Sequence, residues 1–278
     1  MSIKSFQQEL YHQHSLDKRE VDLIICHVLG INTAGLFIYE KPISETIKKS
    51  IKELIQDRTD GKPLAYITGH KHFWTLDLKV NQHTLIPRPE TELIVELILK
   101  WTDDNYSGSL LDLGTGSGAI ALSVAKHRPK SAIIAVDFSA ECVEIAQFNQ
   151  QNNAIKNVSI LQSDWFSQLD NKKFDYILSN PPYIAENDPH LSALTYEPIY
   201  ALTAKKKGYA DLEHIIKTSK KHLNLYGILV LEHGYNQSET VQKLLNENNY
   251  SEIKTHLDFA NIPRITTAQL QNIAIDKE

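Results

Sequence analysis

Residues 109–122 read Ser109-Leu110-Leu111-Asp112-Leu113-Gly114-Thr115-Gly116-Ser117-Gly118-Ala119-Ile120-Ala121-Leu122. The apolar residues at the start of this segment predict a short buried strand, and the glycine-rich turn after them predicts its end. A helix is expected to begin at about Gly118. Glycine lets the backbone approach a ligand closely, and the first N–H groups of a helix have no partner within it. The segment therefore predicts a strand, a turn and a helix, with a ligand site at the turn.

The spacing of the three glycines narrows the kind of ligand. The dinucleotide fingerprint is Gly-x-Gly-x-x-Gly, whereas this turn has Gly-x-Gly-x-Gly. The difference disfavours a nicotinamide oxidoreductase. With Asp112 two residues before the first glycine, the turn resembles that of S-adenosylmethionine-dependent methyltransferases. The resemblance implies S-adenosylmethionine as the cofactor and a binding turn that consists of Gly114, Thr115, Gly116, Ser117 and Gly118.

Two further predicted strands lead into acidic residues. Residues 131–136 form an apolar run that ends at Asp137. An acid about twenty residues beyond such a turn can accept hydrogen bonds from both ribose hydroxyls of a nucleoside. Asp137 could instead cap the next helix, although Ser139 can do that alone. Residues 158–162 lead to Asp164 and Trp165, a carboxylate for an adenine amino group and an indole to lie against the ring, unless Trp165 is a plain core residue.

A fourth predicted strand, residues 174–179, runs directly into Asn180-Pro181-Pro182-Tyr183. Two prolines cannot continue a parallel sheet, so the chain must leave it at Asn180. Ligands of open α/β sheets bind at the carboxyl ends of the strands. The amide oxygen of Asn180, the free carbonyls of the prolines and the ring of Tyr183 suit a planar NH2 group. The motif therefore predicts a site for an amide or an exocyclic amine.

Motifs along most of the chain resemble the bacterial release factor glutamine methyltransferases, the PrmC (HemK) family. These motifs are Pro63-Leu64-Ala65-Tyr66-Ile67-Thr68-Gly69, Phe73-Trp74, Ile86-Pro87-Arg88-Pro89-Glu90-Thr91-Glu92, the glycine turn, Asn180-Pro181-Pro182-Tyr183, Glu197-Pro198 with Ala201-Leu202, and Leu231-Glu232-His233-Gly234 with Gln237. The resemblance implies N5-methylation of the glutamine side chain in the Gly-Gly-Gln sequence of peptide chain release factors. One departure is the run Lys205–Lys207 before Gly208, where the family usually has an acidic, glycine-rich turn.

The implied reaction needs orientation more than a base, because an amide nitrogen is a poor nucleophile that no side chain deprotonates at neutral pH. We expect the side-chain oxygen of Asn180 and the backbone oxygen of Pro181 to accept hydrogen bonds from the two N–H groups of the substrate amide. This would align the nitrogen with the methyl group and its sulfur. Tyr183 would pack on the amide plane, and Pro182 completes the substrate site. We also expect Asn180 to bind the cofactor, with its own NH2 group donating to the cofactor carboxylate or to a nearby backbone carbonyl.

The fold class implied by the resemblance is α/β, a doubly wound seven-stranded class I methyltransferase sheet. We expect it over residues 87–278, with a helical substrate-recognition domain over 1–70 and a β-hairpin linker over 71–86. In the first domain, residues 17–20 read as a capping box, and another helix should follow Ser44. In the linker, residues 74–80 alternate in strand fashion and residues 85–86 should pair back on them.

The expected elements after residue 87 alternate between helices and strands. Apolar spacing predicts helices over residues 93–101, 211–223 and 237–246, strands over residues 227–231, 252–257 and 264–269, and a loop from Tyr183 to about Gly208 that serves as a lid or a substrate-docking segment.

Composition narrows the partners. The formal net charge of −5 disfavours a protein that grips duplex nucleic acid. Cys26 and Cys142 make neither a disulfide framework nor a zinc site, and no metal is expected. No apolar run has the length of a membrane span. We expect a cytoplasmic monomer whose partner is a release factor. The alternatives are a ribosomal-protein glutamine methyltransferase, an adenine-N6 DNA methyltransferase, or a binding module that has lost catalysis.

Overall fold

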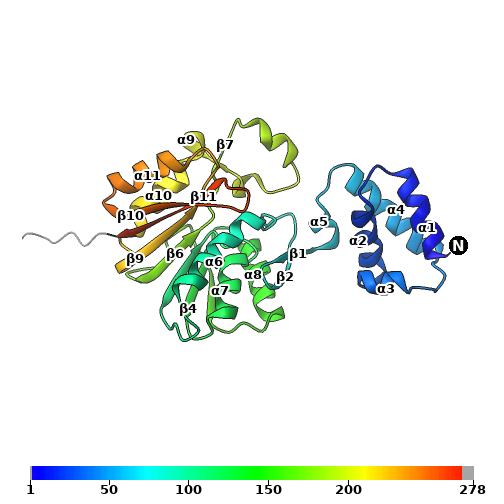
Figure 1. The fold of residues 1–278 in the computed structure, drawn as a ribbon, viewed down its shortest axis with the longest axis horizontal. Helices are drawn as coiled ribbons and strands as arrows, with labels where there is room; N and C mark the ends of the chain where they lie inside the picture. The colour runs from blue at the N-terminus through cyan, green and yellow to red at the C-terminus, as the bar shows by residue number, and fades with distance from the viewer. Residues whose placement is uncertain (1, 271–278) are drawn as a thin grey trace, which may run out of the picture. The chain divides into compact units, whose positions relative to one another are not determined.

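The computed structural model describes residues 2–270, which fall into two compact units, one ending at His70 and one beginning at Lys71 (Figure 1). The smaller unit contains the helices α1 (Ile3–Gln13), α2 (Lys18–Leu29), α3 (Thr33–Phe37), α4 (Glu45–Thr59) and α5 (Leu64–Thr68). Within the described residues, no helix has both the length and the apolar character that a membrane crossing requires.

The helices of the smaller unit have the predicted caps and apolar faces. Asp17 accepts a hydrogen bond from the Arg19 N–H at 2.7 Å and so caps α2. Ser44 caps α4 in the same manner. Glu20 does not complete the predicted capping box at residues 17–20, because its carboxylate forms a salt bridge with Arg58 of α4 at 3.0 Å. The buried faces of α1, α2 and α4 meet in one core, so packing rather than propensity holds this unit together.

The larger unit is built on a seven-stranded sheet. Its elements are the hairpin strands β1 (His70–Phe73) and β2 (Leu76–Lys79), η1 (Pro89–Thr91), α6 (Glu92–Trp101), β3 (Ser109–Leu113), α7 (Ala119–His127), β4 (Ala132–Asp137), α8 (Ala140–Asn152), β5 (Val158–Gln162), β6 (Phe174–Ser179), β7 (Ile184–Ala185), η2 (Pro189–Ala193), η3 (Ile199–Ala201), β8 (Thr203–Ala204), α9 (Lys205–Gly208), α10 (Ala210–Ser219), β9 (Leu223–Glu232), α11 (Ser238–Glu247), β10 (Tyr250–Leu257) and β11 (Pro263–Leu270). The strand order is β10-β11-β9-β6-β3-β4-β5, with β10 and β11 antiparallel. The predicted doubly wound sheet and its closing antiparallel edge are confirmed.

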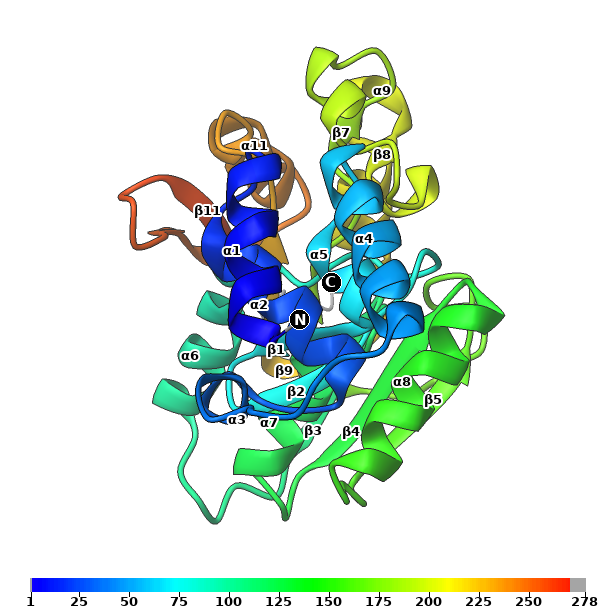
Figure 2. The same ribbon diagram turned by 90° about the vertical axis from the view of Figure 1, so that its right-hand side faces the viewer.

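Helices cover both faces of this sheet. Leu110 packs with α6, α7 and α8 on one face, and the next residue, Leu111, packs with α10 and α11 on the other. Successive side chains of a strand point to opposite faces, so a strand covered on both sides must be apolar throughout. Figure 2 shows α8 along β4 and β5 at the edge of the sheet.

The strand register places the ends of β3, β4, β6 and β9 next to one another in the sheet. Leu113 at the end of β3 lies opposite Val136 of β4 and Ser179 of β6, and Ser179 lies opposite Leu231 of β9. The Ser179 hydroxyl donates to the Leu113 carbonyl at 2.8 Å across the two strands. From β3 the chain extends the sheet to β4 on one side and later returns to add β6 on the other side. The carboxyl ends of β3 and β6 therefore form the topological switch point, where ligands of such sheets bind.

The hairpin differs from its prediction. β2 pairs with β1, the segment before it, and residues 85–86 form no strand, so the predicted partner was wrong. A tight turn at Trp74, which has φ 53°, lets β1 fold back directly. The Ile86 N–H donates instead to the Glu197 carboxylate at 3.1 Å, and Pro87 after it has no N–H for a ladder. Phe73 and Leu76 of the hairpin are buried in the core of the larger unit.

Two other boundaries were also predicted wrongly. The helix expected to reach Leu223 ends at Ser219, and Leu223 already opens β9 and pairs with Phe174 of β6. Burial of Leu223 against the sheet outweighs the helical spacing of the residues before it. The segment expected as a loop contains β7 and β8, which pair in parallel through Ile184 and Thr203.

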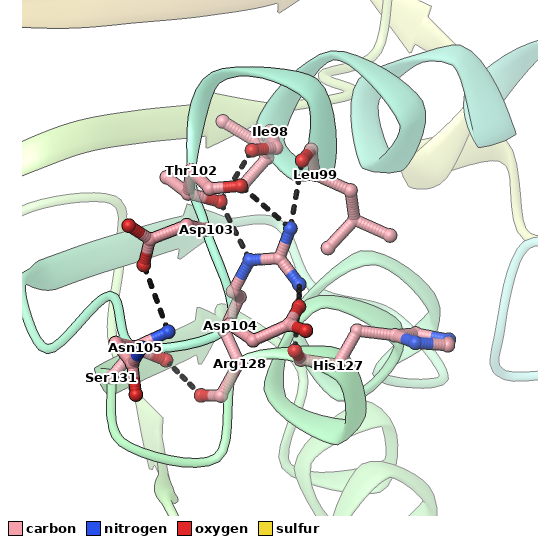
Figure 3. A network of polar contacts seen from close by, with 9 residues as sticks. All are labelled: Ile98, Leu99, Thr102, Asp103, Asp104, Asn105, His127, Arg128 and Ser131. Carbon is pink, nitrogen blue, oxygen red and sulfur yellow. Dashed lines mark hydrogen bonds and ion pairs between the residues drawn. The ribbon is translucent and has the colours of Figure 1, made fainter.

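A buried arginine closes the end of α6 (Figure 3). Arg128 is only 6% exposed, and it donates to the Leu99 and Thr102 carbonyls, both at 2.7 Å, and to the Thr102 hydroxyl at 2.8 Å. The last carbonyls of a helix have no partner within it. Arg128 supplies their donors from the segment that leads into β4. The contact with Asp104 adds little, because that carboxylate is 95% exposed.

We expect Arg128→Ala to lower the free energy of unfolding of the larger unit by about 2–4 kcal/mol, since buried carbonyls lose their donors. Urea unfolding followed by tryptophan fluorescence measures this, because all three tryptophans, Trp74, Trp101 and Trp165, lie in that unit. Lys130→Ala, an exposed cation on the same connection, is the control and should change the value by less than about 0.5 kcal/mol. An equally small effect of Arg128→Ala would contradict the assigned role.

Candidate active site

Two cavities meet at Asn180, just beyond the carboxyl ends of the central strands. The first, here called the glycine-turn cavity, is lined by the sequence-predicted residues Gly114, Gly116, Asp137, Asp164, Trp165, Asn180 and Pro182. The second, here called the Tyr183 cavity, is lined by Asn180, Pro181 and Tyr183 together with Arg88. The four-residue motif after β6 is therefore divided, with Asn180 facing both cavities.

The three glycines of the turn have different tasks. The N–H groups of Gly114 and Thr115 both donate to the Val136 carbonyl at 2.9 Å, which folds the turn tightly over β4. Gly116 has φ 56° and open space where a side chain would stand, so its backbone faces the cavity. Gly118 begins α7, and a Cβ there would lie 2.7 Å from Leu122, so this glycine serves helix packing. The first two glycines leave the backbone open to a ligand.

The other predicted residues of the turn lie inside the protein. Thr115 and Ser117 are 5% and 2% exposed and are not among the described residues that line the cavity. The Thr115 hydroxyl donates to Asp112 Oδ2 at 2.7 Å, and the Ala121 N–H donates to the same oxygen at 3.1 Å. Asp112 thus ties the turn to α7 from below. Burial raises the pKa of this carboxyl to about 7, against the lowering effect of those two hydrogen bonds.

Asp137 stands at the end of β4 and lines the cavity. One carboxylate oxygen accepts from the Gly116 N–H at 2.8 Å and the other from the Ser139 N–H at 3.0 Å. Burial raises the pKa of Asp137, which these backbone donors oppose. Helix α8 is capped by Ser139, whose hydroxyl accepts from the Cys142 N–H at 3.1 Å. Since each carboxylate oxygen can accept more than one hydrogen bond, Asp137 retains capacity for a ligand.

The lining of the glycine-turn cavity is also aromatic and acidic. Trp165 has φ 46°, and its indole lies beside Gly114, 3.6 Å from where a Cβ of that glycine would be. Three carboxylates, of Asp137, Asp164 and Asp211, line the cavity, and none of its described lining residues is a lysine or an arginine. This charge pattern suits a cationic ligand or hydroxyl and amino donors and repels phosphates. The residues therefore fit S-adenosylmethionine better than a dinucleotide.

We expect Asp137→Ala to weaken S-adenosylmethionine binding by about 1–3 kcal/mol, because the bound hydroxyls would lose a buried acceptor. Titration calorimetry gives the dissociation constant. Glu144→Ala removes an exposed carboxylate from α8 and should leave that constant unchanged, which separates the local contact from the change in net charge. If the two variants bound the cofactor equally well, Asp137 would not hold the ribose.

Asn180 is oriented by a residue far away in the sequence. Its Nδ2 donates to the hydroxyl of Thr91, in η1, at 3.1 Å. Thr91 is only 4% exposed, so this contact is shielded from water. The amide oxygen of Asn180 is thereby left for the cavities. Pro181 is buried beside it and lines the Tyr183 cavity.

Tyr183 is held at both ends. Its hydroxyl donates to Glu232 Oε1 at 3.3 Å, and its carbonyl accepts from Gln237 Nε2 at 3.0 Å. Gly208 packs so closely that a Cβ there would lie 2.2 Å from the Tyr183 carbonyl oxygen, and its φ of 90° also requires glycine. Burial raises the pKa of the Tyr183 phenol. Tyr183 is therefore neutral at physiological pH and cannot act as a base.

The segment from β7 to α9 is anchored to the site. Glu197, 7% exposed, pairs with Arg88 as well as accepting from the Ile86 N–H. The Tyr200 hydroxyl donates to the His83 carbonyl at 2.8 Å. The run Lys205–Lys207 is where this sequence departs from the family pattern. Within it, Lys206 and Lys207 have φ of 53° and 59°, a conformation that favours glycine. The segment expected as a lid or a substrate-docking segment thus contributes Tyr200 and Ala201 to the cavity wall.

Sequence reasoning missed several residues of the site. The structure adds Leu85, Phe138, Cys142, Ser163, Tyr200, Ala201 and Asp211 to the glycine-turn cavity, and Arg88, Thr91 and Glu232 around Asn180 and Tyr183. Phe138 directly follows a predicted site residue at a strand end, which was a usable signal. Arg88, Thr91 and Glu232 stand in quoted motifs, but nothing local assigned them a task.

Family models match two parts of this chain, and curated relatives match most of it. The methyltransferase small domain family matches residues 90–197, and the PrmC N-terminal domain family matches residues 3–69. The release factor glutamine methyltransferase of Aliivibrio fischeri is 42% identical over 259 residues, which cover 91% of this chain and 91% of the relative. The enzyme of the same name from Escherichia coli is 42% identical over 252 residues, 90% of this chain and 91% of the relative.

Solved structures resemble the fold at low sequence identity. A methyltransferase from Pyrococcus furiosus has a TM-score of 0.54 and 19% identity and covers 78% of this chain and 96% of its own. The 16S rRNA N2 G1207 methyltransferase of T. thermophilus, in complex with AdoMet and guanosine, has a TM-score of 0.53 and 19% identity, over 73% of this chain and 50% of its own. These likenesses show the fold alone.

Proposed function

The chain belongs to the release factor glutamine methyltransferase family, and from that membership we propose how its two cavities divide the work. This protein methylates a glutamine of a peptide chain release factor. The glycine-turn cavity takes S-adenosylmethionine, and the Tyr183 cavity takes the glutamine side chain of the Gly-Gly-Gln sequence. The single observation that carries this assignment is that Asn180 lines both cavities.

In the glycine-turn cavity, Asp137 accepts from the ribose hydroxyls, and Asp164 accepts from the adenine amino group. Trp165 and the backbone of Gly114 and Gly116 form the walls between them. The lining fits this ligand because its carboxylates complement a sulfonium and an ammonium group, and because Gly116 leaves room at the turn. When bound, S-adenosylmethionine supplies an electrophilic methyl group on its sulfonium sulfur.

In the Tyr183 cavity, the two N–H groups of the glutamine amide donate hydrogen bonds to the Asn180 side-chain oxygen and the Pro181 carbonyl. These acceptors hold the nitrogen toward the shared wall of the cavities and favour the positive charge that develops on it. Tyr183 packs against the amide plane, and Pro182 closes the cofactor side. The surplus proton leaves to water after transfer, so the neutral Tyr183 need not accept it.

We propose that the smaller unit recognises the folded release factor. Its described residues include two exposed apolar side chains, Phe37 at the end of α3 at 79% exposure and Ile38 just after that helix at 76%. Exposed apolar residues beside balanced charge suit docking to a protein surface. Up to Ile86 the sequence has eleven Lys and Arg against ten Asp and Glu, which gives this part no excess of basic residues for binding nucleic acid.

We also propose that the protein acts as a monomer in the cytoplasm and holds no nucleic acid stably. The net charge of −5 supports the last point. The test of the substrate is incubation with methyl-labelled S-adenosylmethionine and, in separate reactions, release factor, ribosomal proteins and DNA. We expect label in the release factor, at the glutamine on digestion. Label in ribosomal proteins or in DNA alone would overturn the proposed substrate.

A further inference from the structure

A buried carboxyl lies behind the two residues assigned to the substrate amide. Glu232, at the end of β9, is 1% exposed. Its Oε1 accepts from the Tyr183 hydroxyl at 3.3 Å, and its Oε2 is buried without a hydrogen-bond partner among the described residues. A buried acceptor without a donor is costly, so its retention calls for a reason.

The matching donor is close by. Thr91 Oγ1 accepts a hydrogen bond from Asn180 Nδ2, so the proton of the Thr91 hydroxyl remains available for donation to another acceptor. Interaction with the Thr91 side chain lowers the pKa of the Glu232 carboxyl, which puts this hydroxyl within reach of the unpartnered Oε2. Asn180, Thr91 and Glu232 therefore form one line of polar groups from the cavity wall into the protein, and Tyr183 joins the line at Glu232.

The direction of the hydrogen bonds along this line has a consequence for Asn180. A side-chain amide can present either its oxygen or its NH2 group to a partner. An ionised carboxylate only accepts, so the Thr91 hydroxyl can pair with the unpartnered Oε2 only by donating its proton, and it then accepts from Asn180. The Asn180 NH2 group is then bound to Thr91, and the oxygen faces the substrate. Without the carboxylate, Thr91 could donate to the Asn180 oxygen and turn the NH2 group toward the substrate.

We propose that Glu232, acting through Thr91, fixes which end of the Asn180 amide faces the substrate. Both are positioning residues, since neither touches the reacting atoms. The inference rests on the proposed function of Asn180 as the acceptor for the glutamine amide. It extends that function by naming what makes Asn180 an acceptor at all.

The ionisation of Glu232 gives the inference a pH dependence. Burial raises the pKa of Glu232 to about 7, opposed by the Thr91 and Tyr183 hydroxyls and by Arg264 of β11, while Glu90 of η1 raises it further. His233, the next residue, remains neutral because burial lowers its pKa, and it contacts Thr266. Below pH 7 the protonated carboxyl becomes a donor and the fixed direction is lost. The rate of methyl transfer should therefore rise as the pH increases through about 7.

The test is single-turnover methylation of release factor by the full chain at saturating S-adenosylmethionine, from pH 6 to pH 9, which runs from about one unit below that pKa to about two units above it. Glu232→Gln has the same shape but can donate to Thr91. We expect its rate at pH 8 to fall about tenfold or more, as for a lost orienting group. The rise in rate near pH 7 should disappear, while the dissociation constants of cofactor and release factor stay within about twofold of the parental values.

Thr91 supplies matched variants that keep the inference testable even if Glu232→Gln fails to fold. Thr91→Ser retains the hydroxyl and should retain the rate and its pH profile. Thr91→Val has the same shape without the hydroxyl and should lose as much rate as Glu232→Gln. The double variant should lose no more than either single variant, because both break one line of groups.

The outcomes separate this inference from the proposed function. Parental rates and pH profiles in Glu232→Gln and Thr91→Val, beside a strong loss in Asn180→Ala, would overturn the inference and leave the function of Asn180 intact. A parental rate in Asn180→Ala would overturn the proposed function itself. A rise in rate near pH 7 that persists in Glu232→Gln would belong to another group, such as Asp112, and would also count against the inference.

Discussion

Replacing Asn180 with alanine is expected to lower the single-turnover rate of methylation about a hundredfold or more, the typical effect of losing an orienting polar group at a reacting centre. The alanine variant loses the acceptor oxygen at the shared wall of the two cavities and the donor to Thr91. Binding of release factor should change little, because we propose that docking rests mainly on surfaces away from this residue. Single-turnover methylation at saturating cofactor and release factor measures the rate, and separate titrations give both dissociation constants.

Asn180→Asp distinguishes the two tasks of the side chain. Aspartate has nearly the same size and still offers an acceptor to the substrate, but it places an acceptor against Thr91 instead of a donor. We expect a rate between those of the parent and Asn180→Ala. Asn187→Ala, an exposed asparagine after β7, is the control and should keep the parental rate. If Asn180→Ala turns over at the parental rate, Asn180 is only a turn residue.

Removing the smaller unit is expected to abolish most methylation of intact release factor, by at least about tenfold, while leaving cofactor binding within about threefold, because docking contacts are lost and the glycine-turn cavity is not touched. The shortened chain should begin at Lys71. Phe73, Leu76 and Leu78 of the hairpin belong to the core of the larger unit, so a later start would damage the fold.

Two controls give this deletion a definite meaning. Tryptophan fluorescence during urea unfolding shows whether the shortened chain is folded, since all three tryptophans remain in it. A short peptide with the Gly-Gly-Gln sequence cannot use a docking surface, so both chains should methylate it at similar rates. Full activity of the shortened chain on intact release factor would show that the smaller unit is dispensable.

The central elements were predictable because their signals are local. The apolar run before Gly114 gave β3, and β6 was predicted with the boundaries that the structure has. A proline lacks an N–H whatever surrounds it, so Pro181 had to end that strand. In a doubly wound sheet, the carboxyl ends of the parallel strands lie at one edge of the sheet. Asp137 and Asn180 both follow such ends, so the sequence alone predicted that they line one cavity.

The boundaries that failed depended on partners elsewhere in the chain. β2 had one candidate partner on each side, residues 70–73 before it and residues 85–86 after it, and the sequence pattern fits both. The choice fell to β1 because Ile86 instead donates to Glu197, 111 residues further on. The end of α10 was likewise set by burial of Leu223 against the sheet. Alternation and helical spacing describe which face a residue prefers, and they do not identify what covers it.

The sequence by itself determined the sheet, the glycine turn and the acceptor-rich motif at Asn180, because glycine, proline and apolar spacing act on their own neighbours. Only the tertiary structure decided how Asn180 is oriented. Thr91 lies 89 residues from Asn180, and Glu232 lies 49 residues from Tyr183. The Thr91 hydroxyl and the Glu232 carboxyl come near Asn180 and Tyr183 only when the strands and helices pack. Which end of the Asn180 side-chain amide faces the substrate is therefore a property of the folded chain.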